Sequence, residues 1–381
     1  MFKINTNIIS GKGELRNLKK YVKKSAIKYP AILCDANLYN NSKYVRDIIK
    51  RNIISSNYLF LFDYKFEPSY QYLDSLIKKV RIKKIYKKID SWIAIGGGST
   101  IDTAKGLAIL CRNKKPSIAY KGFPKKLNTP LPIIAIPSTT GTGSEVVYNA
   151  SFIDEKNKVK MGINYVFNYP IIAILDPLVV STAPKNIFAM SSCDTLVHIL
   201  ESFVSIKNTP QSRVFSKHAY SLIIKNFPII MKGRGKIDNW LNMQWASVFA
   251  MFALSNTSSG PAGALSYHLG TNYGINHGFA GGMIIGKITR YNHKSNYFEY
   301  SDLLSSNTKN YSMMSLKQKS LTVVRQVEDF LRIAKVPSLK SFGINHKRTD
   351  EFINFSKRTK TAFNFNPVKV NINSLIKYFL R

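Results

Sequence analysis

The sequence predicts an α/β amino-terminal domain with a mostly parallel sheet, followed by an all-α carboxyl-terminal domain. Up to about residue 188, short apolar runs alternate with helical stretches, which is typical of strand–helix–strand units and a parallel sheet. Beyond that point the strand signals fade, and long helical stretches continue to the carboxyl end. The change of periodicity predicts two domains, residues 1–185 and residues 186–381.

Four apolar runs are the clearest predicted strands of the first domain. They are Ala31 to Asp35, Tyr58 to Tyr64, Trp92 to Gly98 and Pro132 to Thr139. The segment from Ser69 to Tyr86 places apolar residues on one helical stripe, namely Tyr72, Leu73, Leu76, Ile77 and Val80. Strands and helices therefore alternate in the order that a parallel sheet requires.

The formal net charge of +35, from 56 Lys and Arg against 21 Asp and Glu, is the most unusual feature of the composition. The basic residues are scattered from Lys3 to Lys377, which disfavours a specific nucleic-acid site but favours anionic cofactors and substrates. Three cysteines at unrelated spacings predict reduced structural thiols. Without a signal-peptide pattern or a run of about 18 apolar residues, we expect a cytoplasmic protein with no membrane partner.

Two turns rich in glycine and hydroxyl groups each follow an apolar strand and precede a helix. The first, GGGSTIDTAKG, begins at Gly96 and enters a helix at about Thr100, and the second, PSTTGTGSEV, covers Pro137 to Val146. In such a turn, backbone N–H groups and a helix dipole face an anion without interference from a Cβ atom. One such turn could be a simple connection, but two in succession predict a dinucleotide site. Neither matches GxGxxG or GxxxxGK[ST], which disfavours an ordinary Rossmann fingerprint and a P-loop.

A second constellation predicts a metal site in the helical domain. Asp194 and His198 are four residues apart in a predicted helix, so both side chains project from one face. His277 lies in a glycine-rich segment, NHGFAGG, which is interpreted as a loop that supplies a third ligand. One carboxylate oxygen and two imidazole nitrogens suit Fe(II) or Zn(II) and leave positions for water and substrate.

These motifs closely resemble those of the iron-containing (group III) alcohol dehydrogenases, within the superfamily of glycerol dehydrogenases and dehydroquinate synthases. The resemblance continues through Asp176 to Ser202, Gly263 to Gly278 and the terminal FNFNPVKVNINSLIKYFL. It implies an NAD(P)-dependent, metal-assisted alcohol dehydrogenase or aldehyde reductase, which transfers hydride between nicotinamide and a primary alcohol or aldehyde. It also implies a homodimer.

The resemblance also indicates which residues bind the cofactor. Asp35 ends a predicted strand, where a carboxylate accepts hydrogen bonds from ribose hydroxyls and repels a 2′-phosphate, which favours NAD over NADP. The alternative for Asp35 is a solvated turn residue. Lys105 belongs to the first motif. The implied cofactor-binding residues are Asp35, Gly96, Gly97, Gly98, Ser99, Asp102, Thr139, Thr140, Thr142 and Ser144.

The fourth metal ligand of the family, a histidine, aligns with Gly263, which has no side chain to offer. His268 is five residues further on, about 140° around a helix, so it cannot simply replace that ligand. Three alternatives remain: three protein ligands completed by water, a register change that brings in His268, or loss of the metal. Tyr267 stands where the family often has a second active-site histidine, and Tyr267 and His268 are the predicted catalytic residues.

Three functions compete at this point. The first is the metal-assisted dehydrogenase, acting on a small alcohol or aldehyde that is polar, sugar-derived or phosphonate-type. The second is a cyclase of the dehydroquinate-synthase type that uses NAD only transiently, although the motif PSTTGTGSEV resembles the dehydrogenases more closely. The third is a non-catalytic, polyanion-binding derivative, motivated by the charge of +35 and by Gly263.

Overall fold

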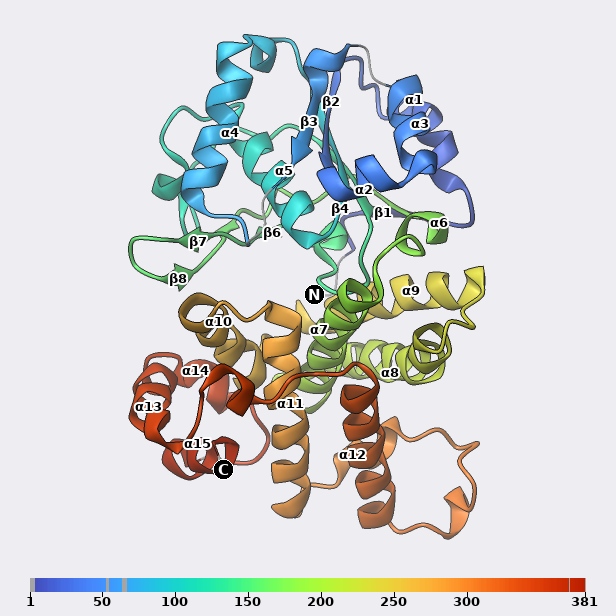
Figure 1. Ribbon diagram of the computed structural model, residues 1–381, viewed down its shortest axis with the longest axis vertical. Helices are drawn as coiled ribbons and strands as arrows, with labels where there is room; N and C mark the ends of the chain where they lie inside the picture. Colours follow the sequence, from blue (N-terminus) through green and yellow to red (C-terminus); the bar gives the residue numbers. More distant parts are fainter. Residues whose placement is uncertain (1–3, 53–54, 64–66, 370, 381) are drawn as a thin grey trace. The chain divides into compact units, whose positions relative to one another are not determined.

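The computed structural model describes residues 4–52, 55–63, 67–369 and 371–380, and the chain divides into two compact units between Pro184 and Lys185. Unit 1 contains a parallel sheet with helices, and the long segments of unit 2 are all helical (Figure 1). The predicted fold class, an α/β part followed by an all-α part, is confirmed.

Within the described residues, the sheet of unit 1 has six parallel strands in the order β1-β10-β5-β4-β2-β3. Ala94 of β4 pairs with Leu33 of β2 on one side and with Ala135 of β5 on the other. The strands β4, β5 and β10 are buried along their whole length, as expected for a sheet that is covered on both faces. The bounds are β1 Asn7–Ser10, β2 Pro30–Asp35, β3 Leu59–Phe62, β4 Ser91–Gly96, β5 Ile133–Pro137 and β10 Ile172–Leu175.

All four predicted strands are present, and three of them end earlier than predicted. The strand predicted to reach Gly98 stops at Gly96, because Gly98 is already helical and α5 begins there rather than at Thr100. The strand predicted from Pro132 to Thr139 stops at Pro137. Tyr64, at the end of another predicted strand, lies outside the described residues.

Helices cover both faces of the sheet in Figure 1. Successive side chains of a strand point to opposite faces, so Trp92 and Ala94 belong to one core while Ile93 and Ile95 belong to the other. The first core is covered by α4 (Tyr70–Ile82) and α5 (Gly98–Leu110), and the second by α1 (Leu18–Lys24) and α3 (Lys43–Asn52). The shorter elements of unit 1 are α2 Ala36–Asn41, α6 Pro177–Val180, and the antiparallel pairs β6 Asn149–Ala150 with β9 Ile163–Asn164 and β7 Ile153–Asp154 with β8 Val159–Lys160.

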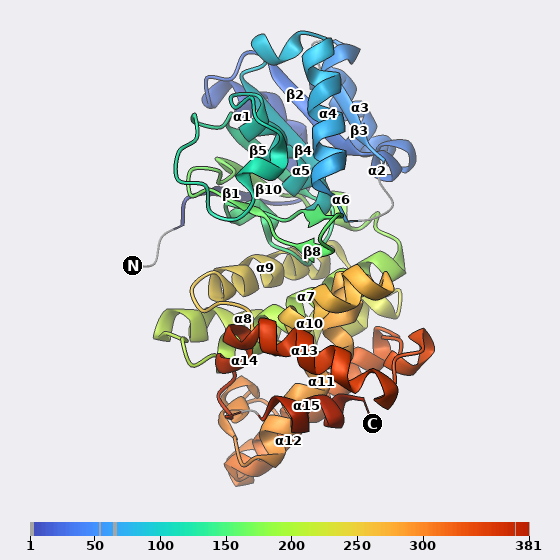
Figure 2. The same ribbon diagram turned by 90° about the vertical axis from the view of Figure 1, so that its left-hand side faces the viewer.

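Unit 2 is built around α7, which packs against α8, α9 and α11, while α13, α14 and α15 contact one another or α10 and add buried residues to the same core (Figure 2). By length and composition α7 could cross a membrane, but 78% of its apolar window is buried inside the protein, as in a core helix. The bounds are α7 Lys185–Val204, α8 Pro210–Met231, α9 Ile237–Leu254, α10 Pro261–Tyr273, α11 His277–Lys294, α12 Leu316–Ile333, α13 Thr349–Arg358, α14 Lys360–Asn364 and α15 Ile372–Phe379.

Glycines bring α11 close to α7. A Cβ atom at Gly278 would lie 2.0 Å from the carbonyl oxygen of Met190, and one at Gly281 would lie 2.9 Å from the side chain of Val197. The predicted glycine-rich loop around His277 is therefore wrong, since Asn276 caps a helix that begins at His277. The glycines of this segment permit close helix packing rather than a turn.

Asp176 joins three segments of unit 1 through its fully buried carboxylate. One oxygen accepts hydrogen bonds from the backbone N–H groups of Gly13 and Leu178, each at 3.0 Å. The other oxygen accepts from the N–H of Leu15 at 3.0 Å and from the hydroxyl of Tyr44 at 2.6 Å. Four donors compensate the burial of this charge, which would otherwise be strongly unfavourable.

We expect Asp176→Ala to lower the free energy of unfolding by about 3–5 kcal/mol, because four donors lose their buried acceptor. Urea denaturation followed by circular dichroism measures the change. The control is Asp329→Ala, whose carboxylate pairs with Arg332 on the surface, so we expect a loss below about 1 kcal/mol. Equal, small losses in the two variants would contradict the role given to Asp176.

Candidate active site

The two predicted cofactor loops lie against each other at the carboxyl ends of β4 and β5, where Gly96 pairs with Pro137. A Cβ atom at Gly98 would lie 2.5 Å from the side chain of Thr142, and one at Gly97 would lie 3.3 Å from that of Thr139. Glycine is therefore what allows the first loop to approach the second. No side chain caps the start of α5, so the N–H groups of its first turn are suited to an anion.

Lys105 is fully buried and connects the two loops. Its Nζ donates to the hydroxyl of Ser144 at 2.7 Å and to the carbonyl of Asn149 at 2.8 Å, and lies 3.6 Å from Asp102. Burial lowers the pKa of Lys105 to about 8, although Asp102 and Glu145 favour the charged form. Burial likewise raises the pKa of Glu145 to about 7.

Asp102 and Ser144 have protein partners in this network. The hydroxyl of Ser144 donates to one carboxylate oxygen of Asp102, and the N–H of Ser151 donates to the other at 2.8 Å. These contacts indicate that Asp102 and Ser144 hold the loops in position, and direct contact of either residue with a cofactor stays a prediction. Among the other predicted residues, Thr140 is buried, whereas Ser99, Thr139 and Thr142 are partly exposed.

Asp35 ends β2, as the sequence predicted, and caps the following helix α2. Its Oδ1 accepts a hydrogen bond of 2.8 Å from the N–H of Leu38. Burial raises the pKa of Asp35, while the backbone N–H groups of Leu38 and Asn37 act in the opposite direction. Asp35 is thus an N-cap residue at the carboxyl edge of the sheet, and the simple solvated turn does not describe it.

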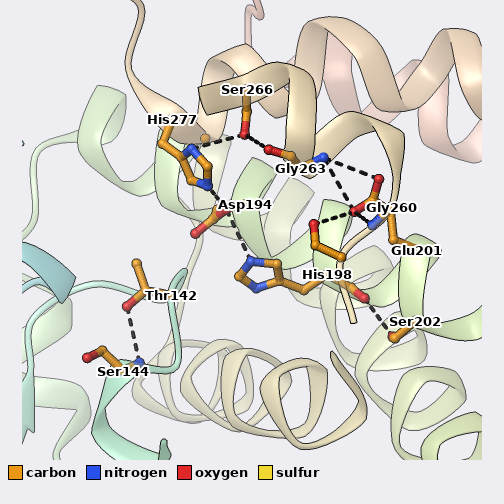
Figure 3. A network of polar contacts seen from close by, with 12 residues as sticks. Thr142, Ser144, Asp194, His198, Glu201, Ser202, Gly260, Gly263, Ser266 and His277 are labelled. Atoms are coloured by element: carbon orange, nitrogen blue, oxygen red, sulfur yellow. Dashed lines mark hydrogen bonds and ion pairs between the residues drawn. The ribbon is translucent and has the colours of Figure 1, made fainter. Parts of the chain in front are cut away.

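In unit 2, Asp194 and His198 lie one turn apart on α7, and His277 at the start of α11 joins them (Figure 3). Oδ1 of Asp194 is 3.4 Å from Nε2 of His198 and 3.8 Å from Nε2 of His277. Ligands about 2.0–2.2 Å from a tetrahedral metal stand roughly 3.3–3.6 Å apart. The donor types and the 3.4 Å spacing to His198 fit a divalent cation, whereas the 3.8 Å spacing to His277 is longer than this range. Within the described part of the chain, no three His, Cys, Asp or Glu side chains form a closed metal-binding group, so these donors would have to draw together.

The Ser259 hydroxyl takes the space beside the Cα atom of Gly263. An ideal Cβ atom on Gly263 would lie 1.8 Å from Oγ of Ser259 and 3.1 Å from a carboxylate oxygen of Glu201. Glu201 is buried on α7, one turn beyond His198, and accepts a hydrogen bond of 3.0 Å from the Ser259 hydroxyl. It also accepts from three backbone N–H groups at the start of α10, those of Gly260, Ala262 and Gly263, at 2.8, 2.6 and 3.2 Å.

The structure does not bring His268 to Asp194. Nε2 of His268 lies 2.9 Å from Oε1 of Glu351, and its ring packs against Phe352 and Phe355 of α13. Burial lowers the pKa of His268, while Glu351 acts in the opposite direction. These contacts connect α10 to α13 and give no support to the register change considered for His268. Its catalytic role stays a prediction.

Tyr267 lies beside the proposed ligand His277. The two rings are stacked, with centroids 4.9 Å apart and planes inclined by 21°. The side chain of Tyr267 is only partly buried. Its catalytic role stays a prediction, and its position beside His277 is consistent with that role.

Three residues of this site were not predicted from the sequence: Glu201, Ser259 and Ser266. Only Glu201 gave a usable signal, as an acidic residue within the apolar run LVHILESFV, because glutamate is rarely buried without partners. The two serines are ordinary residues of their segments. Their importance depends on neighbours that only the fold brings together.

Comparisons with known proteins agree with this architecture. The family model "Iron-containing alcohol dehydrogenase" matches residues 5–177, and the model of the carboxyl-terminal part of that family matches residues 188–379. The chain belongs to the iron-containing alcohol dehydrogenase family. It is therefore an oxidoreductase of the alcohol dehydrogenase class, and the cyclase alternative has no support in these matches.

Individual relatives of this family cover the chain from end to end. An alcohol dehydrogenase of Thermococcus barophilus is 28% identical over 407 residues, covering 100% of this chain and 98% of the relative. A crystal structure of 1,3-propanediol oxidoreductase has a TM-score of 0.88 at 22% identity, covering 100% of this chain and 99% of that one. A sulfoacetaldehyde reductase from Bifidobacterium kashiwanohense, solved with NAD+, has a TM-score of 0.85 at 22% identity, covering 100% and 98%.

Gly263→Ala tests whether the space at position 263 is filled. We expect it to lower the free energy of unfolding by about 1–3 kcal/mol, because the new methyl group displaces Ser259 from Glu201. Thermal and urea unfolding measure the change. Adding Ser259→Gly should restore part of the loss, since that change removes the nearest atom.

The matched control is Gly270→Ala in the same helix. A Cβ atom there meets only the carbonyl oxygen of Ile275, at 3.4 Å. It should be neutral or stabilising by up to about 1 kcal/mol through helix propensity. A Gly263→Ala variant as stable as Gly270→Ala would show that position 263 has room for a side chain.

Proposed function

We propose that this chain is an NAD-dependent, metal-assisted alcohol dehydrogenase or aldehyde reductase, with the cofactor held by unit 1 and a divalent cation by unit 2. The observation that carries the proposal is that the imidazoles of His198 and His277 both lie close to Oδ1 of Asp194. The family match gives the reaction class, since its members are iron-containing alcohol dehydrogenases.

The cofactor side of the proposal rests on unit 1. The uncapped start of α5 would accept the pyrophosphate, with Gly97 and Gly98 providing backbone N–H groups at close range. Asp35 at the end of β2 would accept the adenosine ribose hydroxyls and repel a 2′-phosphate, which favours NAD. The structure of a sulfoacetaldehyde reductase with NAD+ supports the same choice by fold.

The metal side rests on the donor set. Asp194, His198 and His277 would hold Fe(II) or Zn(II), which supplies Lewis-acid polarisation of the substrate oxygen. Tyr267, stacked on His277, would direct its hydroxyl to that oxygen and exchange a hydrogen bond with it. The buried surroundings of Asp194 exclude water and strengthen each electrostatic interaction of the set.

The substrate class follows from charge and from relatives. A net charge of +35 favours anionic molecules, and a sulfoacetaldehyde reductase of Bilophila wadsworthia is 28% identical over 73% of this chain. We therefore propose a small polar or anionic aldehyde, of the sugar-derived, phosphonate or sulfonate type. The cytoplasmic location stays a proposal, supported by the free thiols of Cys34, Cys111 and Cys193.

Asp194→Ala tests the metal site. In anaerobically purified protein we expect about one iron or zinc per chain in the wild type and loss of most of it in the variant, because two imidazoles alone bind weakly. Elemental analysis and NADH oxidation with an aldehyde panel are measured on the same samples. Asp238→Ala, at an exposed position on α9, is the control and should retain metal and activity.

Two outcomes would overturn the metal site. One is a wild type without bound metal, and the other is full metal content in Asp194→Ala. If the protein also fails to bind NADH but binds RNA in a steeply salt-dependent way, the polyanion-binding derivative becomes the better function. That second candidate is favoured by the charge of +35 and by Gly263.

Asp35→Ser tests the choice of cofactor. Serine can still cap α2, so the change removes the carboxylate while keeping the helix start. We expect the preference for NADH over NADPH to fall by about tenfold or more, equivalent to roughly 1.4 kcal/mol, measured as the ratio of kcat/KM values. Asp90→Ser, at the amino end of β4, should leave the ratio unchanged, and an unchanged ratio in Asp35→Ser would exclude ribose recognition by Asp35.

A further inference from the structure

Ser266 holds the imidazole of His277 from the side opposite to Asp194 (Figure 3). Its Oγ lies 2.6 Å from the carbonyl oxygen of Gly263 and 3.0 Å from Nδ1 of His277. Ser266 is buried on α10, and His277 begins α11, so the contact joins two helices.

The protons of this chain of contacts can be counted. A carbonyl oxygen cannot donate, so the proton between Gly263 and Ser266 must be that of the hydroxyl. Because a hydroxyl has only one proton, Ser266 must then accept from His277, and Nδ1 of His277 must carry a hydrogen. In a neutral imidazole the other nitrogen, Nε2, then has a lone pair, and this is the atom that faces Oδ1 of Asp194 at 3.8 Å.

The far end of the same chain of contacts is Glu201. The N–H of Gly263 donates to its buried carboxylate at 3.2 Å, and the carbonyl of the same residue, in the next peptide group, accepts from the Ser266 hydroxyl. Glu201 lies on α7, the helix that also carries Asp194. The backbone of Gly263 therefore has a defined place in the site although the residue offers no ligand atom.

We propose that Ser266 is a positioning residue that keeps His277 in the Nδ1–H tautomer, so that Nε2 is available to a cation beside Asp194. The cation part of this inference rests on the proposed function, whereas the tautomer does not. Without the Ser266 hydroxyl, the proton can move to Nε2 and donate to Asp194, which occupies the ligand nitrogen. Hydrogen-bond partners of metal-ligating histidines typically affect metal affinity by about 10–100-fold.

The first test reads the tautomer without metal. Ring 15N shifts of His277 are recorded by NMR on 15N-histidine-labelled, metal-free protein well above the imidazole pKa, with the signal identified by its loss in His277→Gln. We expect Nδ1–H in the wild type and in Ser266→Thr, and a shift towards Nε2–H in Ser266→Ala. A wild-type His277 in the Nε2–H form, or an unchanged tautomer in Ser266→Ala, would overturn the proposal.

The second test measures Zn²⁺ affinity by competition with a chromophoric chelator. Ser266→Ala should bind Zn²⁺ about 10–100-fold more weakly, while Ser266→Thr should stay close to the wild type. The control is Ser356→Ala, because Ser356 is a buried helical serine that donates to the carbonyl of Phe352 at 2.7 Å and belongs to a different helix, α13. If the wild type binds Zn²⁺ more tightly than Asp194→Ala does, equal affinity in Ser266→Ala and Ser356→Ala would overturn the proposal.

Failure of the proposed function gives a different pattern. If the wild type and Asp194→Ala bind Zn²⁺ equally weakly, the metal site is wrong, and the tautomer measurement alone decides the role of Ser266. If the wild type binds Zn²⁺ tightly and Ser266→Ala does so equally, the metal site stands and the role of Ser266 is excluded.

Discussion

The hydrogen bonds of the buried Glu201 carboxylate are the interaction on which the site of unit 2 depends. Three backbone N–H groups at the start of α10 and one hydroxyl converge on it, those of Gly260, Ala262, Gly263 and Ser259. A helix start that is buried must have its N–H groups satisfied, and an anion there is favoured by the helix dipole. Because Glu201 and Asp194 lie on the same helix, this contact fixes α10 relative to the donors on α7.

In unit 1, the positively charged side chain of Lys105 connects separate segments in a similar way. Lys105 is buried where two loops meet, and its contacts with Ser144 and Asn149 replace the water that it loses. Burial moves the pKa of Lys105 down and that of Glu145 up, so each group is held nearer to its neutral form. Both units therefore use buried ionisable side chains to fix loops or helix starts that come from separate parts of the sequence.

The sequence allowed the fold class, the central strands and the donor spacing on α7 to be predicted, because these depend on local periodicity. Asp194 and His198 needed only one helix to come together. The segment after His277 was misinterpreted because glycine favours turns by itself, whereas here it permits close contact with Met190 on another helix. The place of His268 could not be predicted either, since its partner Glu351 is distant in sequence.

Gly263 shows that a glycine in place of a family metal ligand can be interpreted in two ways. A glycine can mean an empty position that water or another ligand fills, or a position already occupied by a neighbour. Ser259, four residues earlier and held by Glu201, occupies the position that a side chain would need. The absence of a ligand at position 263 therefore does not leave α10 without a role. Its Gly263 carbonyl and its Ser266 hydroxyl form hydrogen bonds that lead to His277, and neither group contacts a cation directly in the proposed site. A cation held as proposed here would depend on the orientation of two imidazoles and one carboxylate more strongly than a cation with a fourth protein ligand.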